Sequence, residues 1–252
     1  MSPLQLAVVG LAALAAGAIN TVVGSGTLIT FPTLIAFGVP PVTANVSNTI
    51  GLVPGAVSGA VGYRRELSGQ RARAIRLGFA FLLGGVVGAV LLLVLPAEAF
   101  SAIVPALIVL GLLLVVLQPR ISAWTDARHG RARQANGGWW VWPAVLGTGV
   151  YGGYFGAAQG VILMGVLGIG IADSLQRLNG LKNILTALVN GVAGLLFVFS
   201  AHVDWTVVVV MAAGSIVGGQ LGATVGRRLS PLTLRIFIVV VGLVALASFL
   251  LR

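Results

Sequence analysis

Two apolar stretches, one in each half of the chain, are interrupted by small and polar residues. The interruption at residues 24–27 reads Gly-Ser-Gly-Thr, and the one at residues 156–160 reads Gly-Ala-Ala-Gln-Gly. At membrane depth the backbone leaves a helix only where protein or a water-filled cavity satisfies its N–H and C=O groups. Helix breaks at corresponding positions of two halves are typical of the substrate site in transporters built from internal repeats. The pattern therefore predicts a membrane transporter.

The rest of the chain is apolar enough to lie in a bilayer. Of its 252 residues, 58% are hydrophobic and 8% are charged, whereas soluble domains carry about 25% charged residues. Several apolar runs reach the roughly 20 residues that cross a hydrocarbon core of about 30 Å. We predict an all-α polytopic membrane protein without a removable signal peptide. Its apolar segments fall at residues 4–23, 27–38, 43–63, 76–95, 100–117, 139–156, 160–171, 178–200, 205–226 and 232–251.

Two of these segments, 27–38 and 160–171, are too short to cross a membrane alone. Each holds about 12 residues, or roughly 18 Å of helix, and each directly follows a break. We expect each to be the second arm of a re-entrant helix pair. The glycine stretches at residues 84–88 and 218–222, which occupy matching positions in the two halves, predict close helix packing.

The matching positions divide the chain into two predicted transmembrane repeats. Residues 1–117 form the first repeat and residues 139–252 the second, and a basic cytoplasmic linker at residues 118–138 joins them. Each repeat is expected to contain a re-entrant pair followed by three transmembrane helices.

Positive charge indicates how the two repeats are oriented. The loop at residues 64–76 is rich in arginine, whereas its counterpart at residues 201–204 has no Lys or Arg. Short basic loops stay in the cytoplasm, so equivalent loops lie on opposite sides and the repeats are inverted. We expect both termini outside the bacterial inner membrane. The net charge of +10 then reflects these loops and not a nucleic-acid partner; the arginines concerned are Arg64, Arg65, Arg71, Arg73, Arg76, Arg120, Arg128, Arg131, Arg133, Arg227 and Arg228.

Lys182 is the only lysine in the chain and lies about one turn inside the segment 178–200. A cation in a membrane helix costs about 3 kcal/mol on insertion scales and marks a functional site. Asn179, Asn183 and Asn190 share one helical stripe beside it, and lipid would offer their amides no partners. We expect Lys182 to bind an anion. The alternative is that its ammonium reaches the cytoplasmic headgroups.

The corresponding stripe of the first half supplies hydrogen bonds without charge. Interhelical polar packing is the alternative role for these residues. Helix N-termini at the two breaks add partial positive charge and free N–H groups, which bind anions. We predict a substrate site formed by Lys182, Asn179, Asn183, Asn190, Asn45, Asn48, Thr49, Gly24, Ser25, Gly26, Thr27, Gln159 and Gly160.

The residues that catalysis or metal binding would need are missing from the apolar segments. The chain has no cysteine, and its five carboxylates lie in loops or at segment edges. A catalytic pocket requires a nucleophile with a base, or a metal site, and a proton or sodium relay requires buried carboxylates. We therefore expect no catalytic residue, no metal, no cofactor and no enzymatic activity.

Four motifs spread over both halves are similar to those of a known family. They read Gly24-Ser-Gly-Thr-Leu-Ile-Thr-Phe-Pro32, Ala44-Asn-Val-Ser-Asn-Thr49, Gln176-Arg-Leu-Asn-Gly-Leu-Lys-Asn183 and Gly218-Gly-Gln-Leu-Gly-Ala223. Over essentially the whole chain they resemble the TauE/SafE sulfite exporter family. That resemblance implies export of small sulfur oxyanions or organosulfonates across the bacterial inner membrane. The chain departs from the family at both breaks, where Gly26-Thr-Leu28 replaces a triple glycine and residues 157–159 are Ala-Ala-Gln.

Residues and resemblance together predict a secondary transporter that exports sulfite or an organosulfonate such as sulfoacetate. The site would lie between the two breaks at the membrane midplane. An inside-negative potential favours outward anion flux by about 2.3 kcal/mol per charge per 100 mV. Two alternatives stay open: an anion channel of the same fold, and a membrane enzyme acting on lipid phosphates, against which the missing acid–base pair counts.

Overall fold

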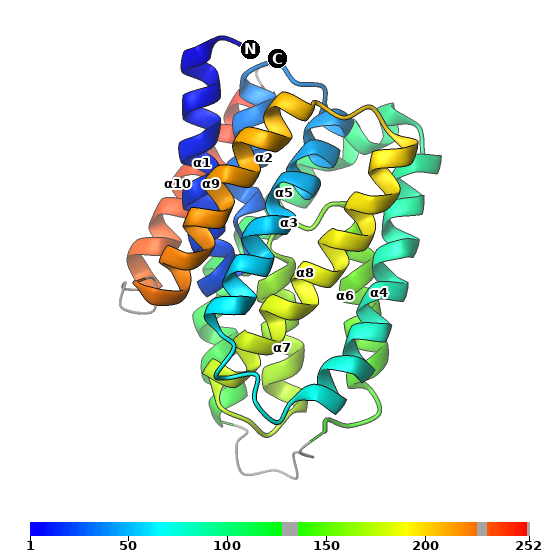
Figure 1. The fold of residues 1–252 in the computed structure, drawn as a ribbon, viewed down its shortest axis with the longest axis vertical. Coiled ribbons are helices and arrows are strands. Elements are labelled where there is room, and N and C mark those ends of the chain that lie inside the picture. The colour runs from blue at the N-terminus through cyan, green and yellow to red at the C-terminus, as the bar shows by residue number, and fades with distance from the viewer. Residues whose placement is uncertain (128–135, 226–230, 251–252) are drawn as a thin grey trace.

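The computed structural model describes residues 1–127, 136–225 and 231–250, which form ten helices (Figure 1). This confirms the all-α prediction. Five of the helices, α1, α4, α5, α8 and α9, are long and apolar enough to cross a membrane. In chain order the helices are α1 (Pro3–Val22), α2 (Thr27–Ala36), α3 (Pro41–Gly62), α4 (Arg71–Val94), α5 (Ala97–Ala127), α6 (Val141–Tyr154), α7 (Gln159–Gly170), α8 (Leu175–Ser200), α9 (Trp205–Thr224) and α10 (Pro231–Leu250).

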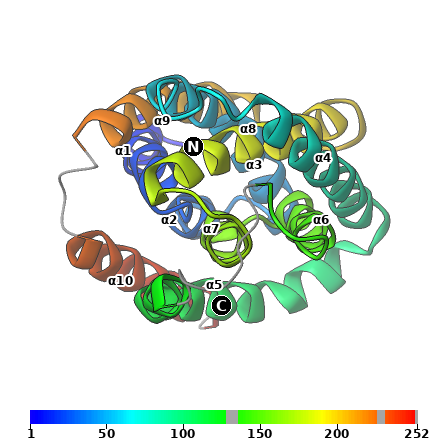
Figure 2. The same cartoon turned by 90° about the horizontal axis from the view of Figure 1, so that it is seen from below.

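The helices stack in three layers (Figure 2). The first layer contains α9, α3, α8 and α4 side by side. In the second layer α1 packs on α9 and α6 packs on α4, with the short helices α2 and α7 between them. In the third, α10 covers α2 and α5 covers α7. Each contact in the first half therefore has a counterpart in the second: α1 packs on α9 as α6 packs on α4, and α2 packs on α10 as α7 packs on α5. The two short helices lie inside the bundle.

Glycines allow the closest contacts between the first two layers. Gly84 and Gly88 of α4 lie against the backbone of α6, and Gly218 and Gly222 of α9 lie against the backbone of α1. A Cβ atom at any of these positions would fall under 3.0 Å from a backbone oxygen of the facing helix. The four-residue spacing is the one through which membrane helices approach closely. The two glycine stretches are therefore close-packing faces, as predicted.

Each short helix folds back beside the helix before it. Met1, just before α1, and Gly38, just after α2, line the same surface pocket. Gly170, at the end of α7, lies against Val141, at the start of α6. Both pairs are therefore helical hairpins, and they enter the bundle from opposite ends (Figure 1); that each hairpin is re-entrant in a membrane stays a prediction. The inversion of the two halves relative to a membrane stays a prediction.

Helix α5 is longer than the apolar pattern predicts. The apolar run ends at residue 117, but α5 continues to Ala127 and includes Pro119. Backbone hydrogen bonds hold a helix together whether or not its side chains are apolar, so the change to polar residues did not mark the helix end. The first part of the predicted linker is consequently helical. Arg128, Arg131, Arg133, Arg227 and Arg228, which support the topology prediction, lie outside the described residues.

Ion pairs tie together the end of the bundle at which α4 and α8 begin. Arg73 Nη1 lies 2.8 Å from Asp173 Oδ2, and Arg177 Nε lies 2.9 Å from Asp173 Oδ1. Burial raises the pKa of the Asp173 carboxyl, but hydrogen bonds from Arg73, the Ser174 backbone N–H and Arg177 outweigh burial, so this pKa lies below its ordinary value. The carboxylate is therefore held in its charged form between two arginines.

Candidate substrate site at the two helix breaks

The two helix breaks contact each other directly. The Gly160 N–H donates a hydrogen bond of 3.1 Å to the Gly24 carbonyl. A Cβ atom on Gly160 would lie 2.5 Å from the Gly24 Cα atom, closer than real Cβ contacts. Gly24 also has a φ of +89°, a left-handed conformation that glycine adopts without steric cost. The predicted approach of the two breaks is confirmed, and glycine on both sides makes it possible.

A side chain from the preceding helix spans each break. Asn20 Oδ1, near the end of α1, accepts a 2.7 Å hydrogen bond from the Gly26 N–H. In the second half the Tyr151 hydroxyl of α6 donates to the Ala157 carbonyl at 2.6 Å. Each side chain satisfies a backbone group that the interrupted helix leaves without a partner. The sequence analysis missed both residues, although each lies within one or two turns of its break.

Lys182 binds the carboxyl-terminal end of α1. Its Nζ atom donates to the carbonyls of Asn20 at 2.8 Å and Thr21 at 3.2 Å. The last carbonyls of a helix lack intrahelical partners and carry partial negative charge, so a cation there is stabilising. Lys182 has an exposed fraction of 0%, which contradicts the alternative that its ammonium reaches the headgroups. An ammonium has three donors, and these two carbonyls use two of them.

Two asparagines of α8 join Lys182 at the same helix end. The Nδ2 atoms of Asn179 and Asn183 donate to the Thr21 carbonyl at 3.1 Å and 3.2 Å. Three of the predicted site residues therefore converge on the last turn of α1. The Nζ atom of the lysine is thereby held beside the first break.

Asn45 of α3 has the same role toward the other hairpin. Its Nδ2 atom donates at 2.9 Å to the carbonyl of Tyr154, the last residue of α6. Asn45 occupies the position in α3 that Asn179 occupies in α8. The third helix of each half, α3 or α8, thus donates a hydrogen bond to a carbonyl at the end of the first helix of the other half, α6 or α1. These reciprocal contacts couple the two hairpins.

The remaining polar residues bind the amino-terminal ends of the short helices. Asn48 Nδ2 donates to Thr27 Oγ1 at 3.4 Å, and its Oδ1 accepts from the Thr30 hydroxyl. Gln159 Nε2 donates to Asn190 Oδ1 at 3.0 Å. The Thr49 hydroxyl instead donates to the Asn45 carbonyl at 2.9 Å. Both residues belong to α3, so this hydrogen bond does not reach a short helix.

Neither short helix is capped by a side chain at its amino-terminal end. The N-cap residues, Gly26 for α2 and Ala158 for α7, supply no side-chain hydrogen bond. The first N–H groups of α7 donate to backbone carbonyls, Gln159 to Gly156 and Gly160 to Gly24, so this end offers an anion its partial positive charge and not free N–H groups. The positive ends of both short helices begin where the breaks meet.

Several buried oxygen atoms around the breaks have no hydrogen-bond partner within the described part of the chain. Buried polar groups in native proteins are nearly always paired, so each unpaired one needs an explanation. The atoms are Ser25 Oγ, Asn45 Oδ1, Gln159 Oε1, Asn179 Oδ1 and Thr186 Oγ1. An anion bound between the breaks could accept hydrogen bonds from the hydroxyls of Ser25 and Thr186, whereas the amide oxygens of the other three residues need a donor.

The structure therefore gathers the predicted residues around the contact of the two breaks, although Thr49 uses its hydroxyl within its own helix. It places the lysine against helix carbonyls, a contact that the sequence did not indicate. Among the residues that the structure describes, no three His, Asp or Glu residues are close enough to hold a metal ion.

The family model for the sulfite exporter TauE/SafE matches residues 9–249. The chain belongs to this family. Relatives in the family carry transporter names. The chain is 27% identical to the probable membrane transporter protein YfcA of Escherichia coli strain K12, over 99% of this chain and 91% of YfcA. It is 28% identical to a probable membrane transporter protein of Haemophilus influenzae, over 81% of this chain and 78% of that protein. No solved structure matches the chain. Membership and relatives together indicate a multi-pass membrane transporter.

Proposed function

We propose that this membrane transporter exports a small sulfur-containing anion, sulfite or an organosulfonate such as sulfoacetate, across the bacterial inner membrane. The observation that carries the proposal is the contact of the two breaks at Gly24 and Gly160, beside the only lysine in the chain. Two helix amino-terminal ends and an ammonium converge there. Such a combination of helix ends and a cation suits an anionic headgroup.

Lys182 would provide the positive charge of the proposed site. Two carbonyls of α1 hold its ammonium, and its third donor is available to an oxyanion. Asn179 and Asn183 hold the same helix end, so they position the lysine. The Ser25 hydroxyl and the second N–H of Gln159 Nε2, which Asn190 does not use, would donate to the anion oxygens.

Transport requires the site to open alternately to the two ends of the bundle. Ser25, Thr27, Gln159 and Lys182 are all buried, and in the proposed cycle this arrangement would be the state closed at both ends. The re-entrant hairpins enter from opposite ends, and movement of either one would open one side. We therefore propose a carrier in which each hairpin is a gate, with both termini on the periplasmic side.

The membrane potential is sufficient to drive the proposed export. An inside-negative potential favours outward movement of an anion by about 2.3 kcal/mol per charge per 100 mV. The five carboxylates of the sequence all lie in loops or at segment edges, so the proposal needs no coupled cation.

A ligand screen on the purified protein tests the substrate class. Sulfite, sulfoacetate, thiosulfate, sulfate and simple carboxylates are added separately, and the melting temperature (Tm) is measured. A ligand at 100 times its Kd stabilises the folded protein by about 2.7 kcal/mol. We expect sulfite or an organosulfonate to raise Tm, and Lys182→Met to abolish the shift. If carboxylates alone raise Tm, the proposed sulfur-containing substrate is wrong. If the protein gives single-channel currents in lipid bilayers, it is a channel and not a carrier.

A further inference from the structure

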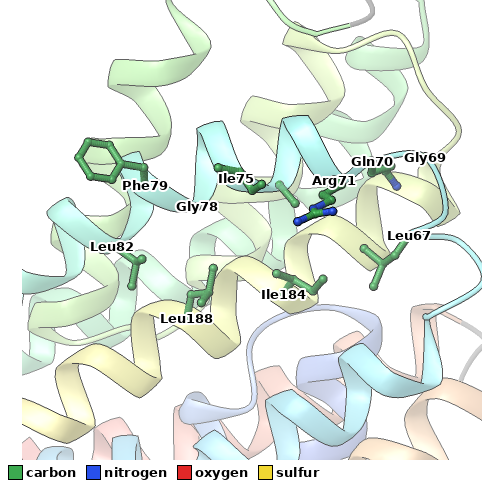
Figure 3. A pocket seen from close by; sticks show the side chains of 11 residues that line it. Leu67, Gly69, Gln70, Arg71, Ile75, Gly78, Phe79, Leu82, Ile184 and Leu188 are labelled. Carbon is green, nitrogen blue, oxygen red and sulfur yellow. The ribbon is translucent and has the colours of Figure 1, made fainter.

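A crevice between α4 and α8 lies on the outer face of the bundle, away from the helix breaks. Its volume is about 580 Å³. Figure 3 shows that its walls come from the first half of α4, from α8 and from the segment that precedes α4. Most of the lining is apolar: Leu67, Ala74, Ile75, Gly78, Phe79, Leu82, Ile184 and Leu188.

Arg71 stands at one end of this crevice and contributes its charge. It is exposed and makes no hydrogen bond or ion pair with any residue in the described ranges. Its neighbour Arg73 differs, because Arg73 is paired with Asp173 at 2.8 Å. The ion pairs of this end therefore use Arg73 and Arg177 and leave Arg71 available to a partner outside the protein.

The length of the crevice matches one leaflet of a bilayer. From Arg71 to Leu82, α4 rises by roughly 16 Å at about 1.5 Å per residue. Half of a hydrocarbon core of about 30 Å is roughly 15 Å. Ile75 and Phe79, with exposed fractions of 63% and 60%, face outward along this length. An acyl chain that starts at the basic end would therefore lie along the apolar walls with its phosphate at Arg71.

We infer that this crevice binds an anionic phospholipid from the leaflet on the arginine-rich side, with one acyl chain in the crevice and the phosphate on Arg71. Basic pockets between membrane helices are the sites at which acidic lipid headgroups bind. The guanidinium provides a planar pair of donors that matches a phosphate. This lipid site is separate from the substrate site and does not depend on the transported anion.

Native mass spectrometry of the full-length protein tests the inference. The protein is titrated with dioleoyl phosphatidylglycerol and with dioleoyl phosphatidylcholine, which have the same acyl chains and differ in headgroup charge. We expect tighter binding of phosphatidylglycerol. Arg71→Gln should weaken that binding about five-fold, which corresponds to about 1 kcal/mol, and should leave phosphatidylcholine binding unchanged. Because Arg71 is exposed, the variant should fold normally.

A second variant and a control separate the crevice from general surface charge. Ala74→Phe should fill the crevice and weaken the binding of both lipids. Arg65→Gln removes an exposed arginine that does not line the crevice and should have little effect. Equal affinity for the two lipids, or an equal loss in Arg65→Gln and Arg71→Gln, would overturn the inference. Dimers that Ala74→Phe converts to monomers, without a change in lipid binding, would instead identify the crevice as an interface between two copies.

Discussion

The contact between Gly24 and Gly160 makes the alanine substitution at position 160 the most informative single change. In a helix, replacing glycine by alanine ordinarily stabilises by about 0.5–1 kcal/mol, because glycine loses more conformational freedom on folding. At position 160 the new Cβ would lie 2.5 Å from Gly24 Cα and 3.0 Å from Gly24 O. Both neighbours are backbone atoms, so the two hairpins must separate. Overpacking of this kind costs about 1–3 kcal/mol.

Gly191→Ala is the matched control for this substitution. Gly191 also lies in a helix, α8, but a Cβ there would meet no atom within 4 Å. We expect Gly191→Ala to be neutral or slightly stabilising and Gly160→Ala to be destabilising. In a chain of this size, each kcal/mol corresponds to a change of about 2–4 °C in Tm.

Gly24→Ala combines the same steric conflict with backbone strain, and a second control separates the two. Gly38 has a similar φ, +85°, but open space around it, so Gly38→Ala carries only the left-handed cost of about 1–2 kcal/mol. Gly24→Ala should lower Tm more than Gly38→Ala does. Thermal unfolding of the four variants in detergent measures these differences. If Gly160→Ala unfolds at the same temperature as Gly191→Ala, the hairpins do not meet as described.

Three further predictions follow from other contacts. Asn45→Ala should destabilise by about 1 kcal/mol and more than Asn179→Ala, because Asn45 alone among the described side chains donates to the Tyr154 carbonyl, whereas the Thr21 carbonyl bound by Asn179 has two other donors. Chemical unfolding of both variants compares them, and equal losses would contradict the reciprocal contacts. The pKa of Asp173 is lowered in the folded state. The ionised carboxylate therefore stabilises the fold fully above the ordinary pKa of 3.8, and this stabilisation is lost as pH falls through the lower pKa of the folded state. Tm measured against pH should fall in that acidic range in the wild type and less in Asp173→Asn. In this cysteine-free chain, a membrane-impermeant maleimide should modify Val203→Cys from the periplasm and Ser68→Cys from the cytoplasm, and the opposite pattern would reverse the topology.

The sequence predicted the architecture well because its signals are local. The short segments after each break could not cross a membrane, and small residues at positions 24 and 160 marked the places where the backbone leaves the helix. The end of α5 was misplaced, since the change from apolar to polar residues near Gln118 does not coincide with the end of the helix, which continues to Ala127.

The contacts of Lys182 could not be predicted from the sequence. Its partners, Asn20 and Thr21, are 162 and 161 residues away in the chain, and only the packing of α8 against the end of α1 brings them together. Backbone carbonyls also leave no mark in a sequence, because every residue has one. The same reason explains why Asn20 and Tyr151, whose partners are backbone groups of the breaks, were not selected as site residues.

Anion flux through Lys182 variants in proteoliposomes is the most direct test of the central claim. Vesicles are loaded with sulfite, a potassium diffusion potential is imposed, and efflux is measured for the wild type, Lys182→Met, Lys182→Arg and the control Gly191→Ala. We predict saturable, potential-driven efflux in the wild type and in Gly191→Ala. Loss of a desolvated charge partner costs on the order of 2–4 kcal/mol, so Lys182→Met should lower the apparent affinity at least about 30-fold, and Lys182→Arg should restore it in part. If Lys182→Met is correctly folded and moves sulfite as the wild type does, the lysine only holds the end of α1 and the proposed anion site is wrong.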